Sequence, residues 1–293
     1  MKEEIRRAVG SIIVEVINSS PNGDPDRDGA PRQREDGRGE ISDKSVKRKW
    51  RDFLENHDGT KFRAFQNLYA FDPERFHIFE SRRRNWKQLI SEISSSAEDY
   101  RETDFCRKYW DGRVFGNTIL EKEMEKQSGK QFVRTGVIVI NPGISISPVK
   151  LVTETFTRKA PVQEGKSRGM APCAYKVVEH GVYVINFSVN AFDADTTGCN
   201  KEDIEMFKRL LPMTYQWNKS SVRSDIRIRH AWYVEYDNWF APCPEGTIWD
   251  ALAPKRIGDP DMPSRSWSDY EDVIDLPAEI KSRVSSVEDL AFK

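Results

Sequence analysis

The first regular stretch of the chain, VGSIIVEVIN at residues 9–18, marks where the fold begins. It is rich in β-branched residues and runs into Ser-Ser-Pro-Asn-Gly, a pattern that predicts a strand ending in a turn. Similar stretches at 132–141, 182–190 and 226–236 predict three further strands. The chain therefore offers four strands for one sheet.

Two helices are expected between these strands. Ser42 is typical of a helix N-cap, and Asn200 is typical of the cap of a second helix that runs to Leu211. Apolar residues recur at helical spacing in both segments: Val46, Trp50, Phe53 and Leu54 in the first, and Ile204, Phe207, Leu210 and Leu211 in the second. The order strand, helix, strand, strand, helix, strand predicts an α+β fold. Its core is ferredoxin-like and RRM-like, an antiparallel sheet with two helices on one face and the other face free.

Two insertions in such a core, 57–131 and 142–180, are too long to be ordinary connections. Residues 57–110 mix aromatic residues with arginines and predict an irregular, partly helical insertion. Residues 150–178 alternate, turn at 164–166 and return with an excess of basic residues, which predicts a hairpin. Such a hairpin is either an ordinary surface feature or a wedge that separates stacked bases.

Composition excludes several classes of protein. The 293 residues are 38% hydrophobic and 32% charged, which is typical of a globular protein. We expect neither a membrane span nor a secretory leader, because no apolar run is long enough and the chain starts Met-Lys-Glu-Glu-Ile-Arg-Arg. The four cysteines and four histidines are dispersed, so a zinc site or disulfide framework is not expected. These features predict a cytoplasmic protein without a cofactor.

The net charge of −1 conceals two halves of opposite sign. Residues 231–293 contain 13 acidic and 6 basic residues, a balance of −7, and residues 1–230 carry +6. The positive half includes Lys44, Lys47, Arg48, Lys49 and Arg51, five basic residues within eight positions of the first expected helix. A solvated surface is the ordinary explanation, but a basic stripe beside a helix N-terminus also suits the nucleic-acid backbone.

Three aspartates in the loop after the first strand suggest two metal-dependent alternatives. Asp24, Asp26 and Asp28, followed by Gly29 and Glu35, fit the letter pattern of a calcium-binding EF-hand loop, but a strand precedes them where a helix is required. Clustered carboxylates can also hold magnesium beside a scissile phosphate, as in a metal-dependent RNase. Turn formation explains the same residues more simply.

These segments, taken in order, resemble the RAMP-superfamily backbone subunit of type I CRISPR Cascade complexes, in particular the type I-C form. The resemblance is carried by the strand leading into SPNGDPD at 20–26, by Pro31-Arg32, and by the helix SDKSVKRK at 42–49. WDGRVFG at 110–116 and SPVK at 147–150 continue it. The resemblance implies a hand-like, non-catalytic subunit, and the related type III subunit, which cuts RNA with a loop aspartate, keeps the enzyme alternative open.

The resemblance also implies domains, partners and a binding site. The palm would comprise 1–56, 111–149 and 179–293 with its acidic C-terminal segment, the fingers 57–110, and the thumb 150–178. Copies would stack head to tail along a CRISPR RNA that pairs with target DNA, beside a guide 5′-end subunit and a large PAM-reading subunit. The residues implied to bind RNA are Lys44, Lys47, Arg48, Arg51, Arg32, Arg113, Lys166, Arg168 and Met170. The acidic segment would face a neighbour's basic surface or repel RNA.

Overall fold

The computed structural model describes residues 5–82, 88, 107–119, 132–159 and 170–292. The strands of the large sheet are β1 (Ala8–Ser19), β2 (Arg38–Ile41), β5 (Ile138–Ile140), β6 (Gly143–Pro148), β7 (Leu151–Lys159), β8 (Met170–Val189), β9 (Asp225–Glu235) and β12 (Ser286–Asp289). Two small sheets pair β3 (Gly116–Ile119) with β4 (Phe132–Thr135) and β10 (Lys255–Arg256) with β11 (Tyr270–Glu271). The helices are α1 (Asp43–Glu55), α2 (Thr60–Tyr69), α5 (Trp110–Phe115), α7 (Ala194–Thr197), α8 (Lys201–Leu210), α9 (Glu245–Leu252) and α10 (Ala278–Lys281).

The centre of the sheet confirms the ferredoxin-like prediction. β1 lies between β8 and β9 and is antiparallel to both, and β5 and β6 pair with β8 on its other edge. With α1 after β1 and α8 after β8, this is the predicted alternation of strands and helices. β12 and β2 extend the two sides of this core.

The prediction of one continuous strand at 132–141 is wrong. It divides at Gly136 into β4, which pairs with β3, and β5, which joins the large sheet. A Cβ atom at Gly136 would overlap the backbone of Phe115 and Gly116, so the chain passes too close to α5 for a side chain. The run of β-branched residues hides this break because both halves are strands.

The helices α1 and α8 pack on one face of the sheet, as expected. The indole ring of Trp50 meets the Phe207 ring edge to face at a centroid distance of 5.4 Å, and both rings are buried against Phe187 and Tyr233 of the sheet. Ser42 caps α1 by accepting a hydrogen bond from the backbone N–H of Ser45, as its position predicts. The predicted cap of α8 is confirmed by a capping box that begins at Asn200.

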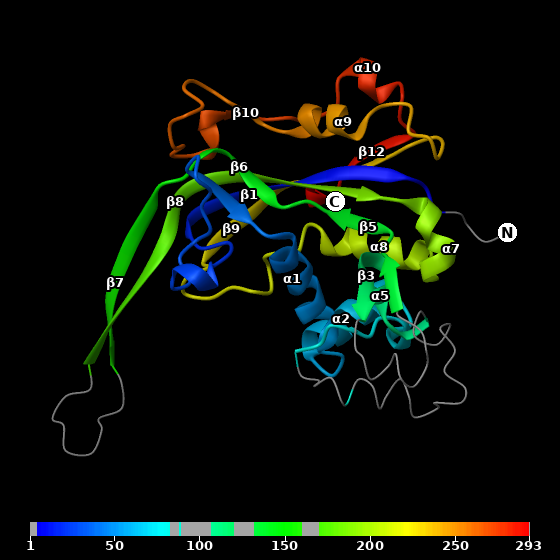
Figure 1. Ribbon diagram of the computed structural model, residues 1–293, viewed down its shortest axis with the longest axis horizontal. Coiled ribbons are helices and arrows are strands. Elements are labelled where there is room, and N and C mark those ends of the chain that lie inside the picture. Colours follow the sequence, from blue (N-terminus) through cyan, green and yellow to red (C-terminus); the bar gives the residue numbers. More distant parts are fainter. Residues whose placement is uncertain (1–4, 83–87, 89–106, 120–131, 160–169, 293) are drawn as a thin grey trace.

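The prediction of a free second sheet face is wrong. Ile13, Trp232 and Val234 lie beneath a second apolar core whose other side is made by the C-terminal segment, including Ile248 and Leu252 of α9. Figure 1 shows α9, β10 and α10 as a layer above the sheet, with α1, α2 and α8 below it. The acidic segment is therefore a folded layer rather than a tail.

The predicted hairpin at 150–178 has two described arms. β7 pairs with the first half of β8 from Leu151 opposite Val178 to Lys159 opposite Met170. β8 then continues without interruption into the sheet, and the hairpin projects from the edge of the molecule (Figure 1). Lys166 and Arg168 lie outside the described residues.

Within the insertion 57–110, the described part contains α2 and a short 3-10 turn at Pro73–Arg75. α2 packs Phe62 and Phe65 into the main core, where Phe65 meets Phe53 of α1 edge to face. None of the helices in the described ranges is both long enough and apolar enough to cross a membrane.

Candidate nucleic-acid interface

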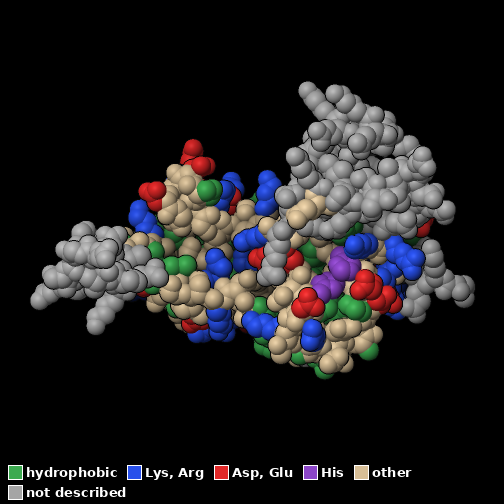
Figure 2. All heavy atoms as spheres, turned by 90° about the horizontal axis from the view of Figure 1, so that it is seen from below, with side chains coloured by type: hydrophobic (Ala, Val, Ile, Leu, Met, Phe, Trp, Pro, Cys, Tyr) green, Lys and Arg blue, Asp and Glu red, His purple; other side chains and the backbone are tan. Residues whose placement is uncertain are grey.

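A cavity of about 480 Å³ opens where the turn after β1 meets the first turns of α1. Its lining includes five cations and one carboxylate, and we call it the cationic pocket: Asn22, Gly23, Pro25, Arg32, Ser42, Lys44, Ser45, Arg48, Arg51, Glu80 and Arg223. Figure 2 views the molecule from the side of the sheet on which α1, α2 and α8 lie, and Lys and Arg side chains are interspersed there with Asp and Glu. The pocket brings together four residues that the sequence predicted to bind RNA.

A buried asparagine fixes the wall of the cationic pocket. The Asn22 side-chain oxygen accepts hydrogen bonds from the Ser42 backbone N–H at 3.0 Å and from the Ser42 hydroxyl at 2.9 Å. Its side-chain amide donates to the Gly23 carbonyl at 2.8 Å, and its own carbonyl accepts from the Arg32 N–H. The Asn-Gly turn and the helix cap are thus one hydrogen-bonded unit, which explains why both occur at the start of the same pocket.

The loop that contains the three aspartates is closed by hydrogen bonds within the turn. Asp24 accepts from the Asp26 N–H at 3.2 Å, and the loop is closed by backbone bonds from Asp24 to Ala30 and from Gly29 to Asp24. Its carboxylate also lies 3.7 Å from the Arg32 guanidinium. Within the described ranges, no three His, Cys, Asp or Glu side chains gather in a way that could hold a metal. The observed contacts are those of the turn that the sequence offered as the simpler explanation.

Two arginines of the predicted basic stripe are bound by carboxylates. Arg48 donates to Asp52 and Glu55 at 2.6 Å each. Arg51 is only 6% exposed and donates to Asp111 at 2.9 Å, with Glu80 at 2.7 Å. These partners offset much of the charge that the stripe was expected to present. The two guanidinium groups shape the inner wall of the cationic pocket, and the expectation of an openly solvated stripe is wrong for Arg51.

Two other cations of the pocket lack a carboxylate partner. In the described part of the chain, neither Lys44 nor Arg223 forms an ion pair. Lys44 is exposed, and the Arg223 guanidinium donates to the carbonyls of Ser20 and Asn218. Arg223 arrives from the loop before β9, which is held by a 2.7 Å bond from the Ser20 N–H to the Val222 carbonyl. Sequence reasoning missed Arg223 because no local pattern links it to a turn 200 residues earlier.

Lys47 and Arg113 are placed differently from the prediction. Lys47 forms an ion pair with Asp43 at 3.1 Å and does not line the cationic pocket. Arg113 is fully buried and binds Asp203 of α8 through two nitrogens, at 2.9 and 2.7 Å. A guanidinium enclosed in this way cannot reach a phosphate, so Arg113 is a structural residue and its prediction as an RNA contact is corrected.

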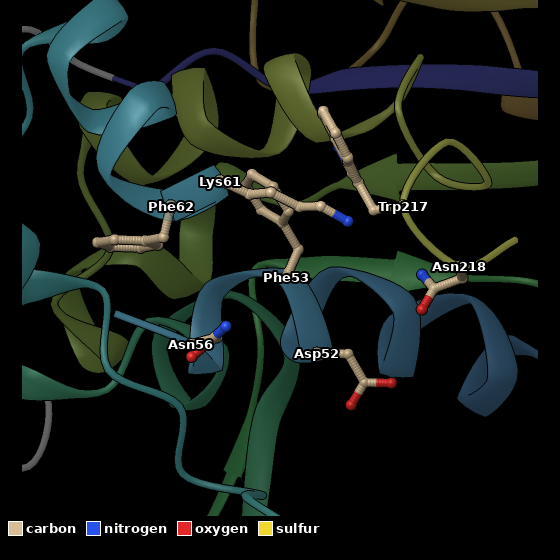
Figure 3. A pocket seen from close by; sticks show the side chains of 7 residues that line it. All are labelled: Asp52, Phe53, Asn56, Lys61, Phe62, Trp217 and Asn218. Carbon is tan, nitrogen blue, oxygen red and sulfur yellow. The ribbon is translucent and has the colours of Figure 1, made fainter. Parts of the chain in front are cut away.

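A smaller cavity of about 140 Å³ adjoins α1 on its C-terminal side (Figure 3). The Trp217 ring stacks on Phe53 at a centroid distance of 5.7 Å, and the Lys61 ammonium lies 5.1 Å from the centre of the indole. Asn218, which also lines this cavity, accepts the hydrogen bond from Arg223. The loop after α8 therefore borders both cavities and holds Arg223 in place.

The chemistry of the cationic pocket is that of anion binding. Its ionisable lining consists of four arginines, one lysine and one glutamate, a set that can accept a phosphate. A ferredoxin-like core with a projecting hairpin and this pocket defines a candidate polyanion-binding protein.

Comparison with known proteins identifies the family of the chain. Residues 6–275 match the family described as CRISPR-associated protein Cas7, and the chain belongs to that family. No curated protein matches the sequence.

Three solved structures resemble the chain at low sequence identity. One, a "CRISPR RNA-guided surveillance complex, pre-nicking", is 11% identical with a TM-score of 0.48, over 83% of this chain and 81% of that one. A "CRISPR RNA-guided surveillance complex" is 13% identical with a TM-score of 0.42, over 85% and 77%. A type III-B Cmr-beta complex bound to cognate target RNA is 7% identical with a TM-score of 0.42, over 78% and 61%.

Proposed function

We propose that this Cas7-family protein is a non-catalytic backbone subunit that binds the sugar-phosphate chain of a CRISPR RNA. Membership of the family supports the role, and the observation that carries it for this chain is the cationic pocket. Binding through phosphates suits a subunit that must accept any guide sequence, because phosphate contacts carry charge and geometry but no sequence information.

Lys44 and Arg223 are the principal phosphate ligands in this proposal. Both line the cationic pocket, and their charge is not committed to a carboxylate in the described structure. Arg32, Arg48 and Arg51 keep their carboxylate partners and complete the lining beside Lys44 and Arg223. We expect Lys47 to contribute less to phosphate binding, because it does not line the cationic pocket.

The projecting hairpin is the second proposed contact. We assign to it the thumb role, with Lys166, Arg168 and Met170 acting on the guide, and we propose palm, fingers and thumb divisions at the boundaries given above. The complex would be a type I-C Cascade in the cytoplasm, in which copies stack head to tail beside a guide 5′-end subunit and a large PAM-reading subunit. The bound guide would then pair with target DNA.

The test is the salt dependence of RNA binding by single-charge variants. Lys44→Met and Arg223→Met should each weaken binding of an unstructured RNA and lower the slope of log Kd against log salt by about 1. Lys255→Met, an exposed lysine of the C-terminal layer on the opposite side of the sheet, is the matched control and should leave the slope unchanged. Equal slopes in all three variants would show that the cationic pocket does not hold phosphate.

A separate incubation distinguishes the scaffold from the nuclease alternative. Complementary RNA is added to the guide-bound protein with magnesium or manganese, and we expect the RNA to remain intact. Cleavage at a fixed spacing that disappears in Asp24→Asn, Asp26→Asn or Asp28→Asn would overturn the scaffold proposal. A calcium-dependent rise in melting temperature without RNA binding would instead support the calcium module.

A further inference from the structure

Resting on the RNA-binding function proposed above, we propose that Lys49 takes up a proton when an RNA phosphate enters the cationic pocket. Lys49 is a positioning residue in this scheme, because it acts on the pocket from behind its wall. Phosphate affinity then depends on pH in the range where cells operate.

Lys49 is held directly behind the pocket lining. Its side chain is 6% exposed, and its ammonium nitrogen donates to the Ser45 hydroxyl at 2.9 Å and to the Ser45 carbonyl at 3.1 Å. Ser45 is itself part of the lining, so Lys49 contacts a residue that borders the cavity. On the other side, the nitrogen lies 4.6 Å from the centre of the Tyr215 ring. A charged group in this position would be enclosed by a helix turn and an aromatic ring.

The charges around Lys49 oppose its protonation. In the part of the chain that the structure describes, no carboxylate lies within ion-pair distance of the Lys49 nitrogen. The charge of Asp52 favours protonation of Lys49, but Asp52 is engaged by Arg48 and Arg82. Two cations also face it, Arg223 from the loop before β9 and Arg82 from the segment after α2. Burial, reinforced chiefly by Arg223, lowers the pKa of Lys49 from 10.5 to about 7.

A bound phosphate would supply the missing counter-charge. It would sit against Ser45, on the far side of the hydroxyl that Lys49 contacts, and would offset the repulsion from Arg223. An anion at this distance favours the charged ammonium, so the pKa of Lys49 rises when the pocket fills. Because linkage is reciprocal, RNA binding takes up a proton, and raising the pH weakens RNA binding.

The sign and size of the effect follow from these two states. Below pH 7, Lys49 is already largely protonated in the free protein, so RNA binding takes up only a small fraction of a proton. Between pH 7 and the raised pKa of the bound state, uptake approaches one proton per protein copy, and Kd increases by up to about tenfold per pH unit.

The experiment is isothermal titration calorimetry of the full-length protein with a single-stranded oligoadenylate that lacks terminal phosphates. Adenylate has no group that titrates near pH 8, so any proton taken up goes to the protein. Measurement at pH 8 in two buffers of different ionisation enthalpy gives the number of protons bound. Wild type, Lys49→Met and Lys44→Met are compared, the last as a control that removes a different lysine, one that lines the pocket directly.

We expect wild type and Lys44→Met to take up close to one proton more than Lys49→Met, with the Kd of Lys49→Met about tenfold less sensitive to a change from pH 7.5 to 8.5. RNA binding with equal proton uptake in all three proteins would overturn this inference and leave the RNA-binding function intact. Absence of RNA binding by wild type would overturn the proposed function itself. If Lys49→Met does not fold, zero uptake by wild type still refutes the inference.

Discussion

Arg113 offers a direct test of a structural role against an RNA-binding role. In the structure its guanidinium makes two bonds to Asp203, at 2.9 and 2.7 Å, and donates to the carbonyls of Arg107 and Arg75 at 2.9 and 2.6 Å. Arg113 belongs to α5 and Asp203 to the first turn of α8, so the pair ties the two helices together. The substitution Arg113→Met keeps much of the side-chain volume and removes every one of these bonds.

The expected cost follows from the burial of the pair. Both side chains are 0% exposed, and removing one member of a buried ion pair typically costs about 3–5 kcal/mol. Asp203 would still have a longer ion pair with Arg75, at 3.4 Å, so we expect a cost near the lower end of this range. For a protein whose total stability is of the order of 5–15 kcal/mol, this is a large fraction. At roughly 2–4 °C per kcal/mol, the melting temperature should fall by about 10 °C.

The assay is urea unfolding together with RNA binding at a temperature where Arg113→Met is folded. We expect lower unfolding free energy and an unchanged Kd for RNA. A second variant, Arg113→Met with Asp203→Asn, leaves no buried charge and should recover part of the lost stability. Normal stability combined with weaker RNA binding in Arg113→Met would refute the reasoning and restore Arg113 as an RNA contact.

Two further predictions concern the sheet and its C-terminal layer. His230 lies 2.6 Å from Asp289 and 2.7 Å from Asp272; burial opposes its protonation, but these carboxylates outweigh burial and raise its pKa above 6.5. The stabilisation is therefore complete below pH 6.5 and is lost as the pH rises through the folded-state pKa, so the urea midpoint should fall over this range in wild type and not in His230→Gln. In Gly10→Ala, a Cβ atom would overlap a carbonyl oxygen of β9 and an aromatic ring of β8, which should cost about 1–3 kcal/mol in urea unfolding. Gly246→Ala, where the added carbon meets nothing within 4 Å, is the control, and equal losses in the two variants would contradict the packing argument.

The sequence predicted those elements whose signal is local. The caps at Ser42 and Asn200 were predicted correctly because a cap needs only a polar side chain three residues before its partner. The cores of β1 and β9 were recognised from their β-branched and aromatic residues. The division at Gly136 was missed, since it depends on the approach of a distant backbone.

The candidate site was predicted only in part. The sequence drew attention to the turn at Asn22 and to the basic start of α1, and the structure places them around one pocket. It could not show that Asp111 takes up Arg51, or that Arg113 is buried against Asp203. A basic residue looks the same in a sequence whether its partner is a phosphate or a carboxylate far along the chain.

The sequence by itself determined the ferredoxin-like order of strands and helices, because periodicity and caps act over a few residues. Only the tertiary structure decided that the acidic C-terminal segment covers the second face of the sheet. The run Ile12-Ile13-Val14, with apolar residues facing both ways, is the one local sign of that second core, and all three side chains are fully buried. Which arginines remain open to an anion was likewise decided by long-range pairing, since Arg223 joins the pocket through a loop that no short-range pattern connects to the turn after β1.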